Sequence, residues 1–340
     1  MKNKILLVTL LTFFFSYSQI SVGPVHYGKA KKFNKSELEK FKKTETIFVL
    51  SSIYERDVYE EILKNSWTVT PYKVVDIEEF DIEDYLSDKY SIAQIKGSIL
   101  EKQKGSGIVG TYLFTYFEIN MYDSEKIFKR LDAMSPKKRN KKKKSIIDMY
   151  SSTFAFFYLF PKDEFIRTSL TSDLDKITIS FFTEDIFYNY KPGLLKNYFQ
   201  KINNLLADEE IYWMYKDDYL PELKKLAKEK LYIPSYMTIK YDPFRAQDSG
   251  ENNESINKVL DSYNYQYEII STDELSKKIM NNEEIYYFRY VRMNSEKFFQ
   301  IVNSKTGEII YRKYTSGFSY NLKPKHIKEL NSKIAKALKK

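Results

Sequence analysis

The sequence predicts an α/β protein built from two duplicated domains, each with the order β-α-β-α-β-β-β-α and a mixed sheet. Two observations support this fold class. Runs rich in β-branched and aromatic residues, typical of strands, alternate with helical patterns in both halves of the chain. Four segments of the first half also have similar counterparts, in the same order, in the second half. We therefore expect related domains at 44–207 and 229–340, joined by a helical connector at 208–228.

The four pairs of similar segments are short, and their common order is what favours a duplication. A helical pattern follows the last pair in both halves. The matches pair Glu45–Ser52 with Glu229–Tyr236, Tyr72–Phe80 with Tyr267–Leu275, Tyr112–Asn120 with Tyr286–Asn294, and Tyr188–Pro192 with Tyr320–Pro324.

The first eighteen residues have the features of a cleaved signal peptide. Two lysines precede an apolar run, Ile5–Phe15, and Ser16 and Ser18 are small residues at the two positions that a signal peptidase reads. A membrane-spanning helix needs roughly 20 apolar residues, and this run is shorter. We therefore expect removal of residues 1–18, an exported protein that is soluble in the periplasm or outside the cell, and an N-terminal arm over 19–43.

In the first domain, apolar and β-branched runs predict strands, and apolar residues that recur every three to four positions predict helices. Pro192 suits the first turn of a helix. Extra residues relative to the second domain are expected at about 98–109 and in a basic insertion at 128–147. In chain order we expect a strand at 46–52, a helix at 57–66, a strand at 69–76, a helix at 78–86, strands at 110–120, 153–160 and 176–183, and a helix at 194–206.

The second domain repeats this order. Thr272 or Asp273 is a suitable N-cap for its second helix. Gly307 suits the left-handed position of a hairpin turn at 303–308. The expected elements are a strand at 230–239, a helix at 255–262, a strand at 265–271, a helix at 274–280, strands at 285–293, 297–303 and 309–313, and a helix from Pro324.

Composition and charge restrict the classes of protein and of chemistry. The chain is 43% hydrophobic and 30% charged, which is typical of a globular core. It contains no Cys, which excludes disulfides, thiol catalysis and zinc–thiolate or iron–sulfur sites. The net charge is +9, and loss of the two lysines of the signal peptide leaves +7. One basic run carries that entire excess.

This basic run has three interpretations. It is a solvated insertion loop, a surface that docks on anionic phosphate-rich membranes, or a site for an acidic protein partner. A lysine close to anionic lipid contributes ~1 kcal/mol of attraction. Because an exported protein does not meet nucleic acid, we expect no nucleic-acid partner. The run consists of Lys137, Lys138, Arg139, Lys141, Lys142, Lys143 and Lys144.

Two further motifs lack the context that their chemistry needs. Gly105–Gly110 matches the dinucleotide-binding pattern, but that chemistry requires a strand before the glycines and a helix after them, and here a strand follows. We expect no nucleotide. The acidic segment 76–88 lacks the glycine that the sharp turn of a calcium loop needs, and helical phasing scatters its carboxylates around the outside. It is therefore interpreted as a solvated helix face, which could pair with the basic run.

The rare side chains suggest structural roles. His26 and His326 are expected at the surface, because neither lies near a serine and a carboxylate in a triad pattern. Trp67 aligns with Tyr263 of the second domain and is expected in the core. Trp213 lies between the domains and is expected to pack them together, with a role in an interdomain binding groove as the alternative.

The order of strands and helices resembles the Rossmann-like units of envelope proteins, such as the N-terminal domain of TolB and the CsgG-like secretion components. The resemblance covers the topology of each repeat and no sequence motif. The chain also resembles uncharacterised secreted bacterial proteins that end in a hairpin like Thr306–Tyr311. These resemblances imply a Rossmann-like fold in the cell envelope and supply no functional residues.

The resulting expectation is an exported, periplasmic, non-enzymatic binding or assembly protein that acts through its surfaces or its interdomain cleft and needs no cofactor. One alternative is an exported hydrolase that uses Asp or Glu carboxylates. A buried carboxylate pair with one raised pKa would favour it. The other alternative is a membrane-surface protein that docks through Lys137–Lys144. The partners expected are an envelope protein or an anionic membrane surface.

Overall fold

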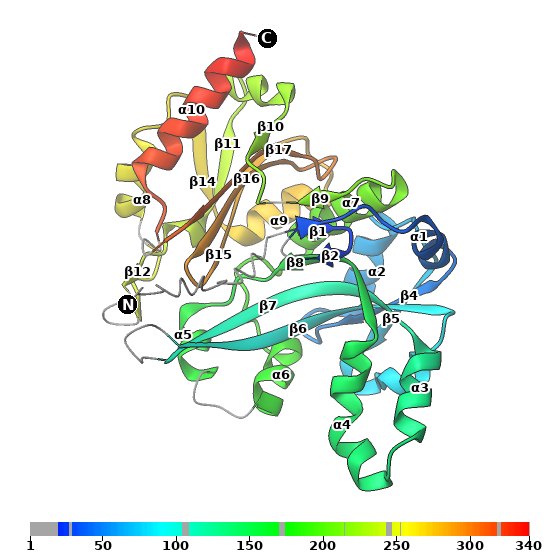
Figure 1. The fold of residues 1–340 in the computed structure, drawn as a ribbon. Coiled ribbons are helices and arrows are strands. Elements are labelled where there is room, and N and C mark those ends of the chain that lie inside the picture. Colours follow the sequence, from blue (N-terminus) through cyan, green and yellow to red (C-terminus); the bar gives the residue numbers. More distant parts are fainter. Residues whose placement is uncertain are drawn as a thin grey trace, which may run out of the picture.

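The computed structural model describes residues 20–26, 29–103, 109–169, 174–213, 215–242, 247–251, 253–317 and 321–339. It contains two mixed sheets with helices packed on them, which confirms the predicted α/β fold class (Figure 1). The expected signal peptide at 1–18 and most of the glycine motif, at 104–108, lie outside the described residues.

The first sheet has seven strands, in the order β5-β4-β6-β7-β8-β1-β9. Strand β4 is parallel to β5 and β6, and β6, β7 and β8 form an antiparallel meander. The bounds are β1 (Ile20–Val22), β4 (Glu45–Leu50), β5 (Tyr72–Asp76), β6 (Tyr90–Gln103), β7 (Val109–Tyr122), β8 (Ser151–Tyr158) and β9 (Tyr212–Trp213).

The second sheet has six strands, in the order β10-β17-β16-β15-β11-β14. Strand β11 is parallel to β14 and β15, and β15, β16 and β17 form an antiparallel meander. The bounds are β10 (Asp218–Tyr219), β11 (Leu231–Pro234), β14 (Tyr267–Ile270), β15 (Tyr286–Met293), β16 (Glu296–Asn303) and β17 (Ile309–Ser316).

The two sheets share one topology. The order β5-β4-β6-β7-β8 in the first corresponds, with the same strand directions, to β14-β11-β15-β16-β17 in the second. The first two sequence matches fall on equivalent strands, and the fourth precedes the closing helix of each half. The third match pairs β7 with β15. These strands are not equivalent, because β15 occupies the place of β6.

Helices pack on the sheets (Figure 1). Short 3-10 helices are η1 (Ile77–Glu79), η2 (Ile82–Tyr85), η3 (Pro221–Ala227) and η4 (Ser235–Thr238), and two small hairpins are β2 (Val25–His26) with β3 (Lys29–Ala30) and β12 (Tyr241–Asp242) with β13 (Gln247–Asp248). The α-helices are α1 (Lys35–Lys42), α2 (Arg56–Lys64), α3 (Ser124–Asp132), α4 (Pro136–Met149), α5 (Asp163–Ser169), α6 (Leu174–Thr183), α7 (Pro192–Ala207), α8 (Asn253–Leu260), α9 (Thr272–Met280) and α10 (Pro324–Leu338).

Helix α7 lies between the two sheets and joins their cores. Its Phe199 ring packs on Phe117 of β7, with ring centroids 5.3 Å apart. The neighbouring Tyr198 ring lies 4.1 Å from the guanidinium of Arg289 on β15. Near the C-terminal end of the helix, Asn203 Oδ1 accepts a hydrogen bond of 2.7 Å from the Thr68 N–H. The first half is therefore closed by a helix that also packs on the second half.

Several expected elements differ in the structure. The strand expected at 176–183 is helix α6, in which Ile177 and Phe181 are buried one turn apart and Ile179 is 59% exposed. Strand β6 was not predicted from the sequence. The acidic segment 78–86 forms 3-10 turns instead of one helix, because Phe80 and Asp81 have extended backbones.

The segments expected outside the domains are also part of the sheets. The expected arm, 19–43, contributes β1 to the first sheet and adds α1. The expected helical connector, 208–228, contains β9 in the first sheet, β10 in the second and only a 3-10 helix. The basic insertion, 128–147, is a helical hairpin of α3 and α4 instead of a loop.

Local predictions of caps and anchors have mixed outcomes. Helix α9 is capped by Ser271, whose Oγ accepts from the Glu274 N–H, and not by Thr272 or Asp273. Gly307 has a φ of 69°, as the hairpin turn requires. Trp67 is in the core and 2% exposed, and its indole N–H donates to Thr70 Oγ1 at 2.8 Å.

Candidate functional site

The basic run lies on a helical hairpin that projects from the body of the protein (Figure 1). Helices α3 and α4 pack on each other, with Ile127 and Leu131 buried on α3 and Ile146 and Ile147 buried on α4. Pro136 begins α4 at a position where its missing N–H costs nothing. All seven predicted basic residues are thereby placed on one rigid helix.

The helical period separates the seven side chains into two groups. Arg139 and Lys143 are half-buried on the inner side. Arg139 pairs with Asp132 of α3 at 3.2 Å, and Lys143 pairs with Glu83 of the acidic segment. The pairing of the acidic segment with the basic run, which the sequence left open, is therefore present. The other five side chains are exposed and have no ion-pair partner among the described residues: Lys137, Lys138, Lys141, Lys142 and Lys144.

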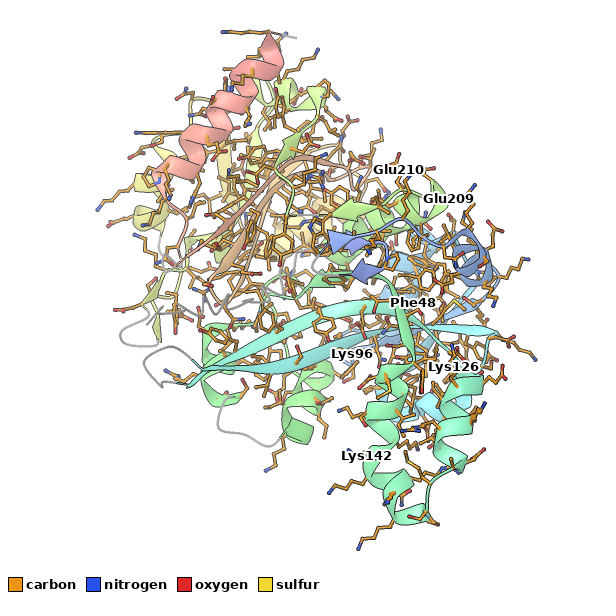
Figure 2. All side chains as sticks on the ribbon, viewed as in Figure 1. Phe48, Lys96, Lys126, Lys142, Glu209 and Glu210 are labelled. Carbon is orange, nitrogen blue, oxygen red and sulfur yellow. The ribbon has the colours of Figure 1, made fainter. Side chains whose placement is uncertain are left out.

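Four of these five lysines are unfavourably placed in the free protein. No acidic residue occupies the first turn of α4, and Lys137 and Lys138 lie near the positive end of the helix dipole. Lys137 and Lys141, like Lys138 and Lys142, are four residues apart, where equal charges repel by about 0.2–0.5 kcal/mol per pair. An anionic surface would reverse both effects. Figure 2 shows Lys142 on this hairpin, away from the rest of the molecule.

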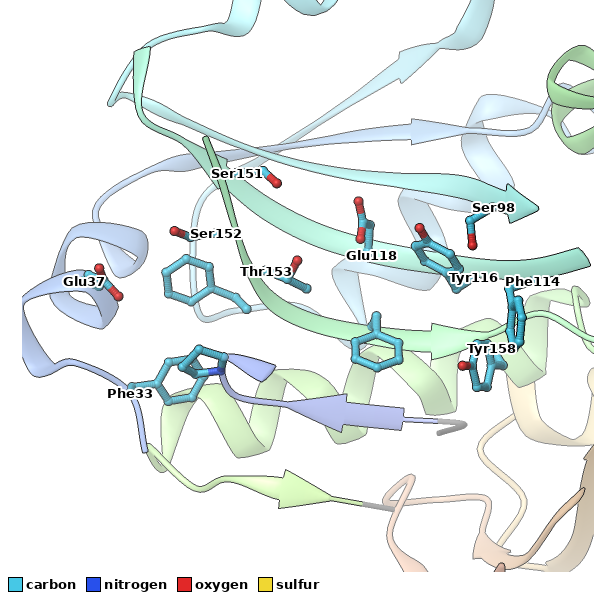
Figure 3. Close-up of a pocket in the computed structure, with 13 residues that line it drawn as sticks. Phe33, Glu37, Ser98, Phe114, Tyr116, Glu118, Ser151, Ser152, Thr153 and Tyr158 are labelled. Atoms are coloured by element: carbon cyan, nitrogen blue, oxygen red, sulfur yellow. The ribbon is translucent and has the colours of Figure 1, made fainter. Parts of the chain in front are cut away.

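A pocket of about 380 Å³ opens on the first sheet. Phe117 and Phe157 of β7 and β8 contact α7, so their neighbours Tyr116, Glu118 and Phe156 point to the opposite face, which is where the pocket lies. Figure 3 shows the pocket above strands β7 and β8, with α1 at one end. Its lining residues are Pro24, Phe33, Glu37, Ser98, Phe114, Tyr116, Glu118, Ser151, Ser152, Thr153, Phe154, Phe156 and Tyr158.

Glu118 is held in place at this pocket by two donors. Its Oε1 lies 2.6 Å from Lys96 Nζ and also accepts from the Asn120 amide. Lys96 Nζ is in turn 3.3 Å from Asp148 Oδ1, near the end of α4. Burial of Lys96 lowers its pKa, but the carboxylates of Glu118 and Asp148 outweigh this effect and raise it overall. The ammonium therefore stays charged and fixes the carboxylate.

A second pocket of about 420 Å³, with more charged residues in its lining, lies between α1 and the residues after α7. Its lining includes Lys32, Lys35, Glu209 and Glu210, so its charges compensate one another. Lys42 pairs with Glu209 at 2.9 Å beside it, and Figure 2 shows Glu209 and Glu210 at this edge. The pocket has no excess of either charge to select a ligand.

Trp213 lies on β9, where it pairs with Ser21 of β1. Its carbonyl accepts a hydrogen bond of 3.2 Å from Arg312 of β17, so the residue does contact the second sheet. Its ring lies 5.2 Å from that of Tyr215. Neither of the two pockets is lined by Trp213. Its role in a binding groove remains a prediction.

A buried carboxylate lies where the two halves meet. Burial raises the pKa of Asp163, the charge of Arg292 opposes this, the charge of Asp248 adds to it, and the pKa is raised overall. The closest partner of Asp163 is the Arg292 guanidinium, which forms a salt bridge with it. A guanidinium favours the ionised carboxylate and does not create a proton donor. Over the described ranges, no group of three or more His, Cys, Asp or Glu side chains is placed to hold a metal ion.

His326, expected at the surface, is buried and 8% exposed. Its Nδ1 accepts a hydrogen bond of 3.2 Å from the Lys323 N–H, and its ring lies 4.6 Å from the ring of Phe299. Burial, together with Lys325, Lys297 and other lysines, lowers its pKa to about 4. The side chain of His26 is not among those described.

No protein-family model and no curated protein matches this chain. Of the helices that the structure describes, none has the length and apolar character needed to cross a membrane. The pocket on the first sheet was missed in the sequence because β6 was not predicted. The sequence nevertheless indicated which residues form the floor of the pocket, because Phe114, Tyr116 and Glu118 alternate with core residues along β7.

Proposed function

We propose that this protein is an exported, non-enzymatic binding protein that docks on anionic membrane surfaces through the outer face of α4. One observation carries the proposal: five exposed lysines occupy one face of a projecting helix and have no ion-pair partner among the described residues. Surface lysines are ordinarily mixed with acidic residues, which limits a single-sign field. Here the field is concentrated at one end of the molecule.

The magnitudes favour a membrane over isolated phosphate groups. Each lysine close to an anionic leaflet contributes ~1 kcal/mol, and the attraction extends over a Debye length of about 8 Å at physiological salt. A rigid helix presents its five lysines to a plane together. Lipid binding would also offset the repulsion between Lys137 and Lys141 and between Lys138 and Lys142. Docking of this kind is weak for one charge and substantial for five.

The remaining features support an envelope setting. Residues 1–18 have the pattern of a signal peptide, and the net charge of the rest of the chain is accounted for by the basic run. The shared strand order of the two sheets supports an origin by internal duplication. The resemblance of each half to Rossmann-like envelope proteins such as TolB agrees with that setting.

Co-sedimentation with vesicles tests the proposal. The protein lacking residues 1–18 is mixed with phosphatidylglycerol-containing vesicles and with pure phosphatidylcholine vesicles, at low and at high salt. We expect binding to the anionic vesicles alone and its loss at high salt. Replacing the five exposed lysines of α4 by Gln should abolish binding. The matched control has the same loss of charge on α8 and α10, at the other end of the molecule, through Gln at Lys258, Lys325, Lys328, Lys336 and Lys339.

Two results would contradict membrane docking. One is equal binding of both five-lysine variants, which would indicate a diffuse effect of net charge. The other is binding that resists high salt. A third result is that no vesicle binds the protein but an acidic envelope protein does. If that binding depends on the same five lysines, the hairpin has an assembly role instead. A carboxylate hydrolase is disfavoured, because Asp163, whose pKa is raised by burial and by Asp248, is paired with the guanidinium of Arg292.

A further inference from the structure

We infer that the pocket on the first sheet binds a small organic cation of the alkylammonium class, between the aromatic side chains of β7 and β8 and the carboxylate of Glu118. This inference goes beyond membrane docking, and it rests on the lining of the pocket. Aromatic rings and carboxylates are combined there, and no Lys, Arg or His lines it.

Three of the aromatic rings that line the pocket pack edge to face. The centroids of Tyr116 and Phe156 are 6.4 Å apart at an interplanar angle of 71°, and those of Phe156 and Tyr158 are 6.1 Å apart at 73°. Perpendicular rings present their electron-rich faces in different directions. At the other end of the pocket, Phe33 stacks on Phe154 at 5.7 Å. Alkylammonium ions bind where they lie within about 6 Å of several ring centroids.

The charges at the pocket favour a cation as well. Glu118 uses Oε1 for its bonds to Lys96 and Asn120, and its Oε2 has no protein partner among the described residues. Figure 3 shows the carboxylate of Glu118 between Tyr116 and Thr153. Glu37 lines the opposite end. Lys96 is shared between Glu118 and Asp148. The three carboxylates of Glu37, Glu118 and Asp148 therefore outnumber the single positive charge of Lys96.

Size restricts the ligand. Pockets for small molecules range from about 300 to 1,000 Å³, and this one, at 380 Å³, is near the lower limit. A single alkylammonium group with a short substituent fits that space. The hydroxyls of Ser98, Ser151 and Thr153 at the rim could accept or donate hydrogen bonds to such a substituent. A neutral sugar is the competing ligand, because sugars also use aromatic rings and hydroxyls, but it would leave the negative charge uncompensated.

The test compares two probes of the same shape. Choline carries a trimethylammonium group, and 3,3-dimethyl-1-butanol is its neutral carbon isostere. Isothermal titration calorimetry of the protein should show choline binding, with the isostere bound about tenfold or more weakly. Equal affinities, or preferential binding of glucose or maltose, would overturn the inference.

Variants locate the site. Glu118→Gln and Tyr116→Leu should each weaken choline binding about fivefold or more. Glu37→Gln, at an exposed position of α1, is a milder variant that should weaken it without threatening the fold. The matched controls, Glu125→Gln and Phe128→Leu, lie on α3 outside the pocket and should bind choline normally. If Glu37→Gln, Glu118→Gln and Tyr116→Leu all bind choline as the wild type does, choline binds elsewhere and the inference is contradicted.

Two sources of the cation can be separated. Choline binding without binding to phosphatidylcholine vesicles would indicate a free cation, whereas phosphatidylcholine binding that choline competes away would indicate a lipid headgroup. The five-lysine variant of α4 should retain choline binding, because those lysines do not line the pocket. Failure of membrane docking is thereby distinguished from failure of cation binding.

Discussion

The guanidinium of Arg292, on β15 of the second sheet, forms a salt bridge with Asp163 at the start of α5, in the first half of the chain. Both side chains are only 6% exposed. The guanidinium also lies 4.6 Å from the ring centroid of Tyr241 and 5.5 Å from that of Phe160. The pair is therefore a desolvated contact between the two halves, and its geometry depends on how they pack.

Breaking this pair on one side should be costly. Asp163→Ala leaves a buried guanidinium without its carboxylate, and Arg292→Met leaves a buried carboxylate without its partner. Each should lower the free energy of unfolding by about 3–5 kcal/mol, whereas the double variant Asp163→Leu/Arg292→Met should be much closer to wild type. Urea denaturation followed by fluorescence of Trp67 and Trp213 measures all three. Additive losses in the double variant would show that the two side chains are not coupled.

Much of the fold was predictable because burial and period agree locally. Strand β4 and helices α7 and α10 have unambiguous patterns and occur close to where the sequence places them. The pattern of helix α6 is ambiguous. Ile177, Ile179 and Phe181 alternate as in a strand, while Ile177 and Phe181 are also four residues apart, as on one face of a helix. The packing of α6 on β6, where Phe181 covers Gly97, decides between a strand and a helix.

The candidate sites were predictable to different degrees. The cluster of basic residues could be read directly from the sequence. Its helical form depends on Ile146 and Ile147, which follow the lysines and are buried on α4. The aromatic pocket requires the register of three strands, including β6, whose outward residue Lys96 interrupts the apolar pattern. Register between distant segments is not encoded in the local pattern of any one of them.

Gly193 should not tolerate a side chain, although it lies in a helix. A Cβ there would be 2.5 Å from the Ser276 backbone oxygen and 2.9 Å from Ile279 Cβ, both on α9. Gly193→Ala gains helix propensity of about 1 kcal/mol, but forcing α7 from α9 typically costs about 1–3 kcal/mol. We expect a lower urea midpoint. Ser276→Ala, which loses only the hydrogen bond to the Gly193 N–H, is the milder comparison. An increase in stability on Gly193→Ala would show that the helices are farther apart.

His326 should make the protein less stable in mild acid. Its pKa is lowered to about 4, chiefly by burial, from an ordinary value of 6.5. Between these values the unfolded chain takes up a proton that the folded protein does not. The free energy of unfolding therefore falls as the pH drops from 6.5 to 4, by about 3 kcal/mol, and this contribution is constant below pH 4. His326→Gln should remove this part of the pH dependence in denaturation curves. Parallel curves for wild type and variant would contradict a buried neutral histidine.

Lys138 allows the stability of α4 to be separated from its docking. Lys138→Glu places a carboxylate in the first turn of the helix and turns the repulsion from Lys142 into attraction. The free protein should gain about 0.5–1 kcal/mol in stability. Lys144→Glu makes the same charge change in the second half of the helix, far from its positive end, and should gain less. Both variants should lose affinity for phosphatidylglycerol vesicles to a similar extent, because both remove a lysine from the same face. Greater stability with unchanged vesicle binding would mean that the outer face of α4 does not meet the membrane, since a charge reversal on a docked face must change its affinity.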